Sequence, residues 1–232
     1  MGKINKKFWV FIPARSGSKG LKNKNIINIK SHPLIGHTIL IAKKIKCCEK
    51  ICFSTDSKLY LKKANRYKIN ETYIRPKNLS KDLIEDKDVI IDYFKKIKKN
   101  GDLPYAVIFL RATNPIRNIN FINKAVKKFL KLKKYDSLCS VEKLKNFPQK
   151  YLSIKNKKLV SLIGHKTIDE TNVPRQTLDE TYKRNGHVEI FKTSNLFKYK
   201  NIYGFKSYPL IDITKTIDID SKKDLSDAKK LL

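Results

Sequence analysis

The sequence predicts a doubly wound α/β fold, in which helices cover both faces of a mainly parallel β-sheet. Short continuous apolar runs, typical of strands buried on both faces, alternate with longer segments whose apolar residues recur at helical spacing. The chain has 232 residues, of which 41% are hydrophobic, so it can bury a sizeable core in one domain. Ligands of such sheets gather beyond the carboxyl ends of the strands, and we look for chemistry there.

The expected elements follow one another in regular order. The run FWVFIPA predicts a strand over Phe8 to Ala14, and the apolar positions between Asp86 and Lys99 have the spacing of a helix. The same patterns predict further strands at 51–54, 72–75 and 105–110, and further helices at 33–46, 58–67 and 121–132.

The pattern changes after about Asp136 to short alternating segments, SLCSV, KYLSI, KLVSLI and HVEIF. We interpret them as a small β excursion, at about 136–190, on a single domain that spans 1–232. The chain then closes with a strand over Thr216 to Asp220 and a terminal helix. The spacing of Ser221 and Asp224 predicts a capping box at the start of that helix.

The net charge is strongly positive, with 52 Lys and Arg against 21 Asp and Glu, or +31. Only seven of these basic residues are arginine, the residue that nucleic-acid binders favour, and the lysines are spread over every predicted helix. We attribute the charge to compositional drift and expect no specific nucleic-acid partner.

The remaining composition indicates a cytoplasmic protein. No apolar run approaches the ~18 residues of a membrane span, and no signal peptide is evident, so we expect no membrane association. The four cysteines lack the spacing of a zinc site, and Cys52 in the run ICFS is expected to be a reduced core residue.

The loop ARSGSKGLKNKN, residues 14–25, directly follows the first strand. Its glycines, Gly17 and Gly20, let the backbone approach a ligand and present N–H groups to an anion, while Arg15 and Lys24 add positive charge. The spacing matches neither the P-loop nor the G-x-G-x-x-G fingerprint. An ordinary basic turn is one interpretation, but the position after the first strand favours a nucleotide phosphate site.

The segment TIDID near the C-terminus carries two spaced acids. On a strand, Asp218 and Asp220 share a face, and two such carboxylates repel each other unless a cation lies between them. Capping of neighbouring loops is the alternative, but the pair favours a Mg²⁺ site.

Taken together, these segments resemble one family. The motifs PARSGSKGLKNKN, PLIGHTI, FSTDSK, RPKNLSKD, RATNPIR, PRQ, NGHVEIF and IDID occur in the order found in acylneuraminate cytidylyltransferases, the CMP-sialic acid synthetases. The resemblance covers essentially the whole chain, and the ordered set is specific although each motif alone is not.

The resemblance implies a Rossmann-like nucleotidyltransferase that joins the CMP of CTP to the anomeric hydroxyl of a nine-carbon sugar acid and releases pyrophosphate. It also implies Mg²⁺ as cofactor and a homodimer in which the β excursion reaches the partner subunit. The residues carried over by matching motifs are catalytic Arg15, Lys24, Asp218 and Asp220, with both aspartates as metal ligands; CTP-binding Ala14, Arg15, Gly17, Ser18, Gly20, Lys24, Asn25 and Arg75; and sugar-binding Arg111, Thr113, Lys150, Arg175, Lys183 and Asn185.

The sequence departs from the family pattern at several positions. Arg111 replaces a glutamine expected to touch the sugar, and we weigh a sugar contact evenly against a structural pairing with Glu85 or Asp86, which replace paired serines. Lys183 stands in place of the family's arginine. The four histidines are isolated in the sequence, and none is an obvious general base.

Two alternatives remain open. One is a cytidylyltransferase for another acidic sugar, of the octulosonate, legionaminate or pseudaminate type, although the S-K-G…K-N loop argues against octulosonate. The other is a basic nucleic-acid-binding protein, which no recognisable motif supports.

Overall fold

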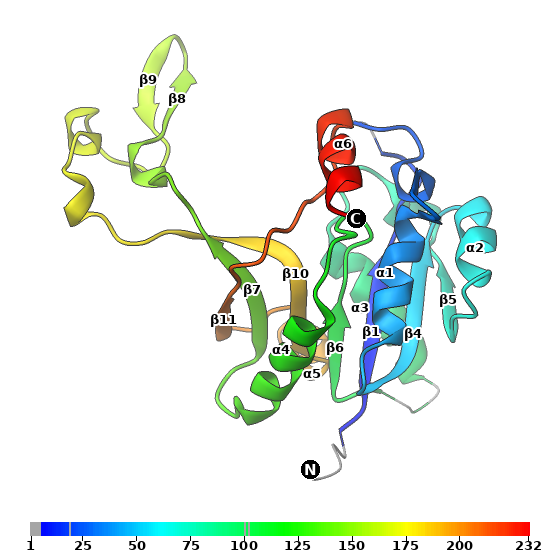
Figure 1. Cartoon of the computed structure of the whole chain (residues 1–232). Coiled ribbons are helices and arrows are strands. Elements are labelled where there is room, and N and C mark those ends of the chain that lie inside the picture. The colour runs from blue at the N-terminus through cyan, green and yellow to red at the C-terminus, as the bar shows by residue number, and fades with distance from the viewer. Residues whose placement is uncertain (1–5, 19, 100, 102) are drawn as a thin grey trace. The chain divides into compact units, whose positions relative to one another are not determined.

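The computed structural model describes residues 6–18, 20–99, 101 and 103–232. Within them, seven strands form one sheet in the order β11-β7-β10-β6-β1-β4-β5 (Figure 1). β1 (Phe8–Pro13) is parallel to both neighbours, β4 (Cys48–Thr55) and β6 (Ala106–Phe109). β5 (Glu71–Ile74) continues this parallel set, whereas β10 (Tyr182–Lys192) runs antiparallel to β6. The predicted α/β sheet is confirmed, and its parallel part carries the predicted strands.

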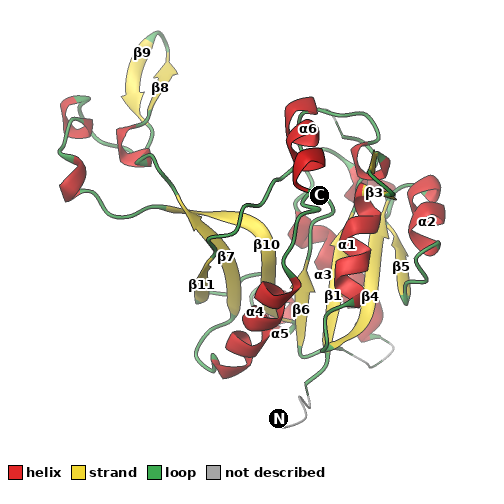
Figure 2. Cartoon of the chain, viewed as in Figure 1, coloured by secondary structure: helices red, strands yellow, loops and turns green. Residues whose placement is uncertain are grey.

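Different helices cover the two faces of the sheet (Figure 2). Alternate residues of β1 point to opposite sides, because side chains alternate along a strand. Phe8, Val10 and Ile12 pack with α1 (Leu34–Lys43), α2 (Lys58–Asn65) and α4 (Ile119–Lys131). Trp9 and Phe11 pack on the other side with α3 (Asp86–Lys98) and α5 (Ser194–Lys198). No helix in the described residues is long and apolar enough to cross a membrane.

Cys52 has its predicted place in the core. It is 1% exposed within the second core, and none of the four cysteines, all of which are described, forms a disulfide. Burial raises the pKa of the Cys47 thiol to about 11 and that of Cys48 to about 12. These thiols are therefore unreactive packing groups near neutral pH.

The C-terminal part differs from the prediction in one element. Thr216 to Asp220 is extended but is not a strand; Ile219 donates one backbone hydrogen bond, of 2.9 Å, to the Thr113 carbonyl. Ile217 and Ile219 pack beside α6 (Lys222–Leu231), and this packing produces the alternation that imitates a strand. The capping box of Ser221 with Asp224 is confirmed.

Three short strands were not predicted. β11 (Ser207–Ile211) forms one edge of the main sheet, and β2 (Asn28–Ile29) pairs with β3 (His32–Pro33) in a small hairpin. Pro209 and Pro33 lie inside these strands, and proline in a short run weakens the pattern that predicts one.

The chain divides into two compact units. The first contains the residues up to Ser140 and those from Asn185 onward, and the second contains Val141–Arg184. The second unit holds the antiparallel hairpin of β8 (Leu152–Lys155) and β9 (Lys158–Ser161) with three short 3₁₀ turns: η3 (Pro148–Lys150), η4 (Asp169–Thr171) and η5 (Arg175–Thr177).

The assignment to a separate β excursion was therefore wrong for two of the four segments. SLCSV belongs to β7 (Ser137–Lys143) and HVEIF to β10, and both are strands of the main sheet. Alternation along a segment shows that one of its faces is buried, but not which sheet it joins.

Candidate active site

A pocket of about 260 Å³ opens in the first unit, at the carboxyl ends of β1, β5 and β6. It is rich in charged side chains, five of them basic and two acidic. The residues that line it are Pro13, Arg15, Ser18, Lys24, Asn25, Arg75, Leu79, Lys81, Asp82, Ile84, Asp86, Arg111, Ala112 and Thr113. This is the edge where the sheet topology predicted ligands, and seven of the predicted site residues meet there.

The loop after β1 forms one wall of the pocket. Ala14 is buried, and its N–H continues the sheet by donating to the Ser54 carbonyl at 2.8 Å. Asp56 fixes the next turn by accepting from the N–H and the hydroxyl of Ser16, at 2.8 and 2.9 Å. Gly17 is exposed, and a Cβ added there would meet no atom within 4 Å, so its surroundings leave room for a ligand.

Gly20 is needed for a different reason from the predicted one. A Cβ at this position would lie 2.4 Å from the carbonyl oxygen of Asp220. The glycine therefore allows the loop and the IDID segment to approach each other, which brings Asp220 next to the loop's cations.

Lys24 holds this contact, and Asn25 fixes the loop itself. Lys24, in the 3₁₀ turn η1 (Lys24–Ile26), donates from Nζ to Asp220 Oδ1 at 2.6 Å. Asn25 is 4% exposed and donates from Nδ2 to the Arg15 carbonyl at 2.9 Å. Its Oδ1 is buried and has no hydrogen-bond partner among the residues that the structure describes. An unsatisfied buried acceptor in a pocket wall suits a ligand that brings a donor, such as a nucleoside amine or hydroxyl.

Arg75 lies on the opposite wall, directly after β5. It is 8% exposed and donates to Ser54 twice, from Nε to the hydroxyl at 2.9 Å and from Nη2 to the carbonyl at 3.2 Å. Burial lowers the pKa of Arg75, although Asp86 and Asp56 oppose this shift. The guanidinium is therefore fixed in direction and remains charged at neutral pH.

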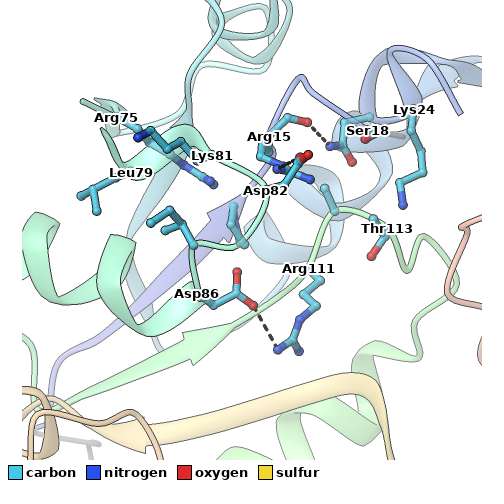
Figure 3. A pocket seen from close by; sticks show the side chains of 14 residues that line it. Arg15, Ser18, Lys24, Arg75, Leu79, Lys81, Asp82, Asp86, Arg111 and Thr113 are labelled. Carbon is cyan, nitrogen blue, oxygen red and sulfur yellow. Dashed lines mark hydrogen bonds and ion pairs between the residues drawn. The ribbon is translucent and has the colours of Figure 1, made fainter. Parts of the chain in front are cut away.

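Arg111 has the structural pairing weighed for it, and its contact with the sugar stays a prediction. It lines the pocket and donates to Asp86 Oδ2 at 3.2 Å (Figure 3). It also donates to Glu189 Oε1 at 2.9 Å. Burial opposes its charged form, but the two carboxylates outweigh burial and raise its pKa. The predicted partner Asp86 is confirmed, whereas Glu85 pairs with Lys87 instead.

The two acids of the IDID segment flank the buried Ile219 and are both exposed. They lie in a loop and not in the predicted strand. Carboxylate oxygens are hard ligands, and Mg²⁺ is usually held by one or two carboxylates together with substrate phosphates. Asp220 pairs with Lys24, which lines the pocket, although neither aspartate lines it. Two neighbouring carboxylates of this kind would suit such an ion.

Asn185 does not line the pocket; it belongs to a buried polar network below it. Its Nδ2 donates to Asp212 Oδ2 at 2.7 Å, and its Oδ1 accepts from the Ser140 hydroxyl at 2.6 Å. His187 joins the network: its Nδ1 lies 2.7 Å from Asp212 Oδ2, and its Nε2 accepts from the Asn118 N–H. Asn185 therefore has a structural role in this network, and its contact with the sugar stays a prediction.

The remaining predicted sugar contacts lie in the second unit. Lys183 forms an ion pair of 2.8 Å with Glu142, and the Arg175 guanidinium lies 5.7 Å from the centre of the Phe147 ring. Lys150 ends the turn η3. The sugar contacts of these three residues remain predictions.

Sequence reasoning missed two important residues, Arg117 and Glu189. Arg117 is 9% exposed and donates to the carbonyls of Arg111, Asn114, Gly186 and His187 and to the Thr38 hydroxyl. Burial lowers the pKa of Arg117 to about 9.

Glu189 is 1% exposed and accepts from both Arg111 and Tyr203. A signal for it existed in the sequence: His187 and Glu189 are polar residues on the same face of the otherwise apolar run HVEIF. Polar residues on a buried strand face indicate a hydrogen-bonded network.

Comparison with known proteins supports the motif-based resemblance. The model of a family described as cytidylyltransferase matches residues 9–232. The chain is 30% identical over 223 residues to the CMP-N,N′-diacetyllegionaminic acid synthase of Legionella pneumophila, covering 95% of this chain and 94% of that protein. It is 30% identical over 219 residues to the N-acylneuraminate cytidylyltransferase of Escherichia coli, covering 94% of this chain and 50% of that protein.

Solved structures support the fold. A CMP:2-keto-3-deoxy-manno-octonic acid synthetase complexed with CTP aligns with a TM-score of 0.69 at 14% identity, over 97% of this chain and 98% of the other. A 4-diphosphocytidyl-2C-methyl-D-erythritol synthase aligns with a TM-score of 0.68 at 8% identity, over 98% and 99%. The family model and the relatives together identify this chain as a member of the cytidylyltransferase family.

Proposed function

We propose that this chain transfers CMP from CTP to the anomeric hydroxyl of a nonulosonic acid and releases pyrophosphate. The observation that carries the proposal is the pocket itself, where five basic side chains gather at the carboxyl ends of the parallel strands. The names of the relatives supply the substrate class, since they act on a legionaminic acid derivative and on N-acylneuraminate. The reaction would take place in the cytoplasm, where the four thiols stay reduced.

The chemistry needs positive charge more than it needs a base. When a hydroxyl attacks the α-phosphorus, negative charge grows on the phosphoryl oxygens and on the departing pyrophosphate. Arg15 and Lys24 are suited to hold the triphosphate, and the fixed guanidinium of Arg75 is suited to contact the nucleotide. Cations held in place before the reaction lower the barrier because they need no reorganisation.

The histidines are unsuited to the role of base. None of the four, all of which are in the described part of the chain, lines the pocket. His187 is fully buried, and burial lowers its pKa, so it is a neutral member of the network with Asp212.

Asp218 and Asp220 are the residues we propose as magnesium ligands. A bound Mg²⁺ would supply further charge stabilisation and lower the pKa of an attacking hydroxyl. Replacing Asp220 with alanine should reduce turnover by orders of magnitude and leave stability nearly unchanged, because the side chain is exposed. A folded variant with near-normal turnover would remove the metal assignment.

The sugar acid needs a second set of contacts. In the first unit, Arg111 and Thr113 line the pocket and offer a guanidinium fork and a hydroxyl. In the second unit, Lys150, Arg175 and Lys183 are the proposed contacts, and we propose a homodimer in which this unit reaches the partner subunit. A guanidinium suits the carboxylate of the sugar, because it can donate two parallel hydrogen bonds.

The test is pyrophosphate release from CTP with a panel of acids: N-acetylneuraminate, a legionaminate, a pseudaminate and an octulosonate. We expect release that depends on CTP, on a nonulosonic acid and on Mg²⁺, and that is abolished by a chelator. Pyrophosphate release with octulosonate alone would show that octulosonate, and not a nonulosonic acid, is the substrate. No release with any acid would contradict the proposed activity.

A further inference from the structure

Three of the pocket's cations already have a carboxylate partner. Arg15 donates to Asp82, Lys24 to Asp220, and Arg111 to Asp86 as well as to Glu189. Figure 3 shows Asp82 beside Arg15 and Asp86 facing Arg111. An anionic substrate that binds these cations must therefore compete with the protein's own carboxylates.

The partners of Arg15 and Arg111 differ in how firmly they are held. The Glu189 side chain is 1% exposed and belongs to the core of β10. The Asp82 side chain is 42% exposed, and it lies between the 3₁₀ turn η2 (Lys77–Ser80) and the start of α3. Its partner Arg15 is 29% exposed. Such a pair contributes little to stability, because water solvates both charges well.

We infer that Asp82 is an internal competitor for the phosphate site and thereby sets the affinity for triphosphates. In the structure its carboxylate accepts a hydrogen bond from Nη1 of Arg15. A triphosphate takes its place, and the free energy of the lost ion pair is subtracted from the binding of the nucleotide. This inference rests on the proposed function, in which Arg15 holds the triphosphate.

The inference predicts a selective effect. Cytidine carries no phosphate and does not compete with Asp82, whereas CTP does. Replacing Asp82 with asparagine removes both the competing ion pair and the repulsion between its carboxylate and the phosphates. We expect Asp82→Asn to lower the Kd of CTP about three- to tenfold at low salt and to leave the Kd of cytidine unchanged. The gain should shrink as salt screens the charges.

A matched control lies in the same segment. Glu85→Gln removes an identical charge three residues away, from an exposed side chain that pairs with Lys87 and does not line the pocket. Calorimetric titration of both nucleotides into the wild-type chain and the two variants tests the proposal. Glu85→Gln should leave both Kd values within twofold of the wild-type values.

Three outcomes would overturn the inference. Unchanged or weaker CTP binding by Asp82→Asn would mean that Asp82 orients Arg15 for phosphate and does not compete with it. An equal gain in CTP affinity for Glu85→Gln would indicate that any lost negative charge near the pocket has this effect. An equal gain in cytidine affinity for Asp82→Asn would indicate a change unrelated to phosphate. The proposed function fails separately, if the wild-type chain does not bind CTP at all.

Discussion

Arg111 and Arg117 lie in the same loop after β6, yet they belong to different parts of the molecule. Arg111 is in the pocket, where its partners are the carboxylates of Asp86 and Glu189. Arg117 is buried below the pocket, where its hydrogen bonds go to four backbone carbonyls and one hydroxyl. One of those carbonyls belongs to Arg111 itself, at 2.7 Å.

The difference shows that partners, rather than residue type, decide what an arginine does. A guanidinium that lines a pocket and pairs with a carboxylate can exchange that carboxylate for a substrate anion. A guanidinium surrounded by main-chain carbonyls fixes the backbone, since removing it leaves several buried acceptors unpaired. The loop therefore combines a residue that lines the pocket with the anchor that fixes its backbone.

The largest expected effect is on the anchor. Arg117→Met should lower the free energy of unfolding by about 3–5 kcal/mol, because the buried acceptors lose their donor. Urea unfolding measures this directly. Arg117→Lys keeps the charge but not the planar fork, and should recover only part of the loss. A loss below about 1 kcal/mol for the methionine variant would contradict the anchoring role.

The pocket arginine should show a smaller loss of stability together with a change in substrate use. Arg111→Gln leaves Glu189 buried with Tyr203 as its remaining hydrogen-bond partner among those identified, and we expect a loss of about 1–3 kcal/mol. If Arg111 also contacts the sugar, the KM for the sugar should rise and the ranking of the acids change, while the KM for CTP stays nearly constant.

The double variant Arg111→Gln, Glu189→Gln separates these two contributions. It should recover part of the lost stability, because no unpaired buried charge remains, but not the KM for the sugar. If stability falls while both KM values and the ranking stay constant, Arg111 is purely structural.

The smallest effect concerns pH and the buried network. Burial lowers the pKa of His187, so below about pH 6.5 the unfolded chain binds a proton that the folded chain does not. Stability should therefore fall between pH 7 and pH 5.5, by at most about 1 kcal/mol. The pKa of Asp212 is also lowered: burial opposes the shift, but hydrogen bonds from Thr214, Asn185 and His187 outweigh it. The stability that ionised Asp212 contributes is lost only below about pH 4, outside the range from pH 5.5 to pH 7.

The control for this prediction is His187→Gln, which cannot take up a proton. Its stability should change less over the same pH range, as measured by urea unfolding at each pH. An equal slope in both proteins would assign the pH dependence to other groups.

The sequence predicted the parallel part of the fold well, because strands buried on both faces and amphipathic helices carry strong periodic signals. The loop cations were predictable for a similar reason: Arg15 and Lys24 follow the first buried strand, and the topology places such loops at the ligand edge. Two of the misses concern partners distant in sequence. Glu189 lies 78 residues from Arg111, and no local pattern connects them.

The alternating segments show where periodicity becomes ambiguous. Ile217 and Ile219 alternate with polar residues because they pack in a small cluster with α6, and the prediction took this loop for a strand. Conversely, the strand β11 was missed because its five residues include Pro209. Hydrogen-bond pairing, which defines a strand, depends on neighbours that a short segment does not specify.

The central claim is that the cations at the carboxyl edge act on phosphate and that the network below them supports the fold. The most direct test is kcat/KM for CTP in Arg15→Met, with stability measured in parallel. The matched control is Arg66→Met, which removes the same charge from an exposed arginine at the end of α2. We predict a loss of about 100-fold or more in Arg15→Met, with less than about 1 kcal/mol lost from its unfolding free energy and normal activity in the control. Near-normal kcat/KM in a folded Arg15→Met enzyme would contradict the claim.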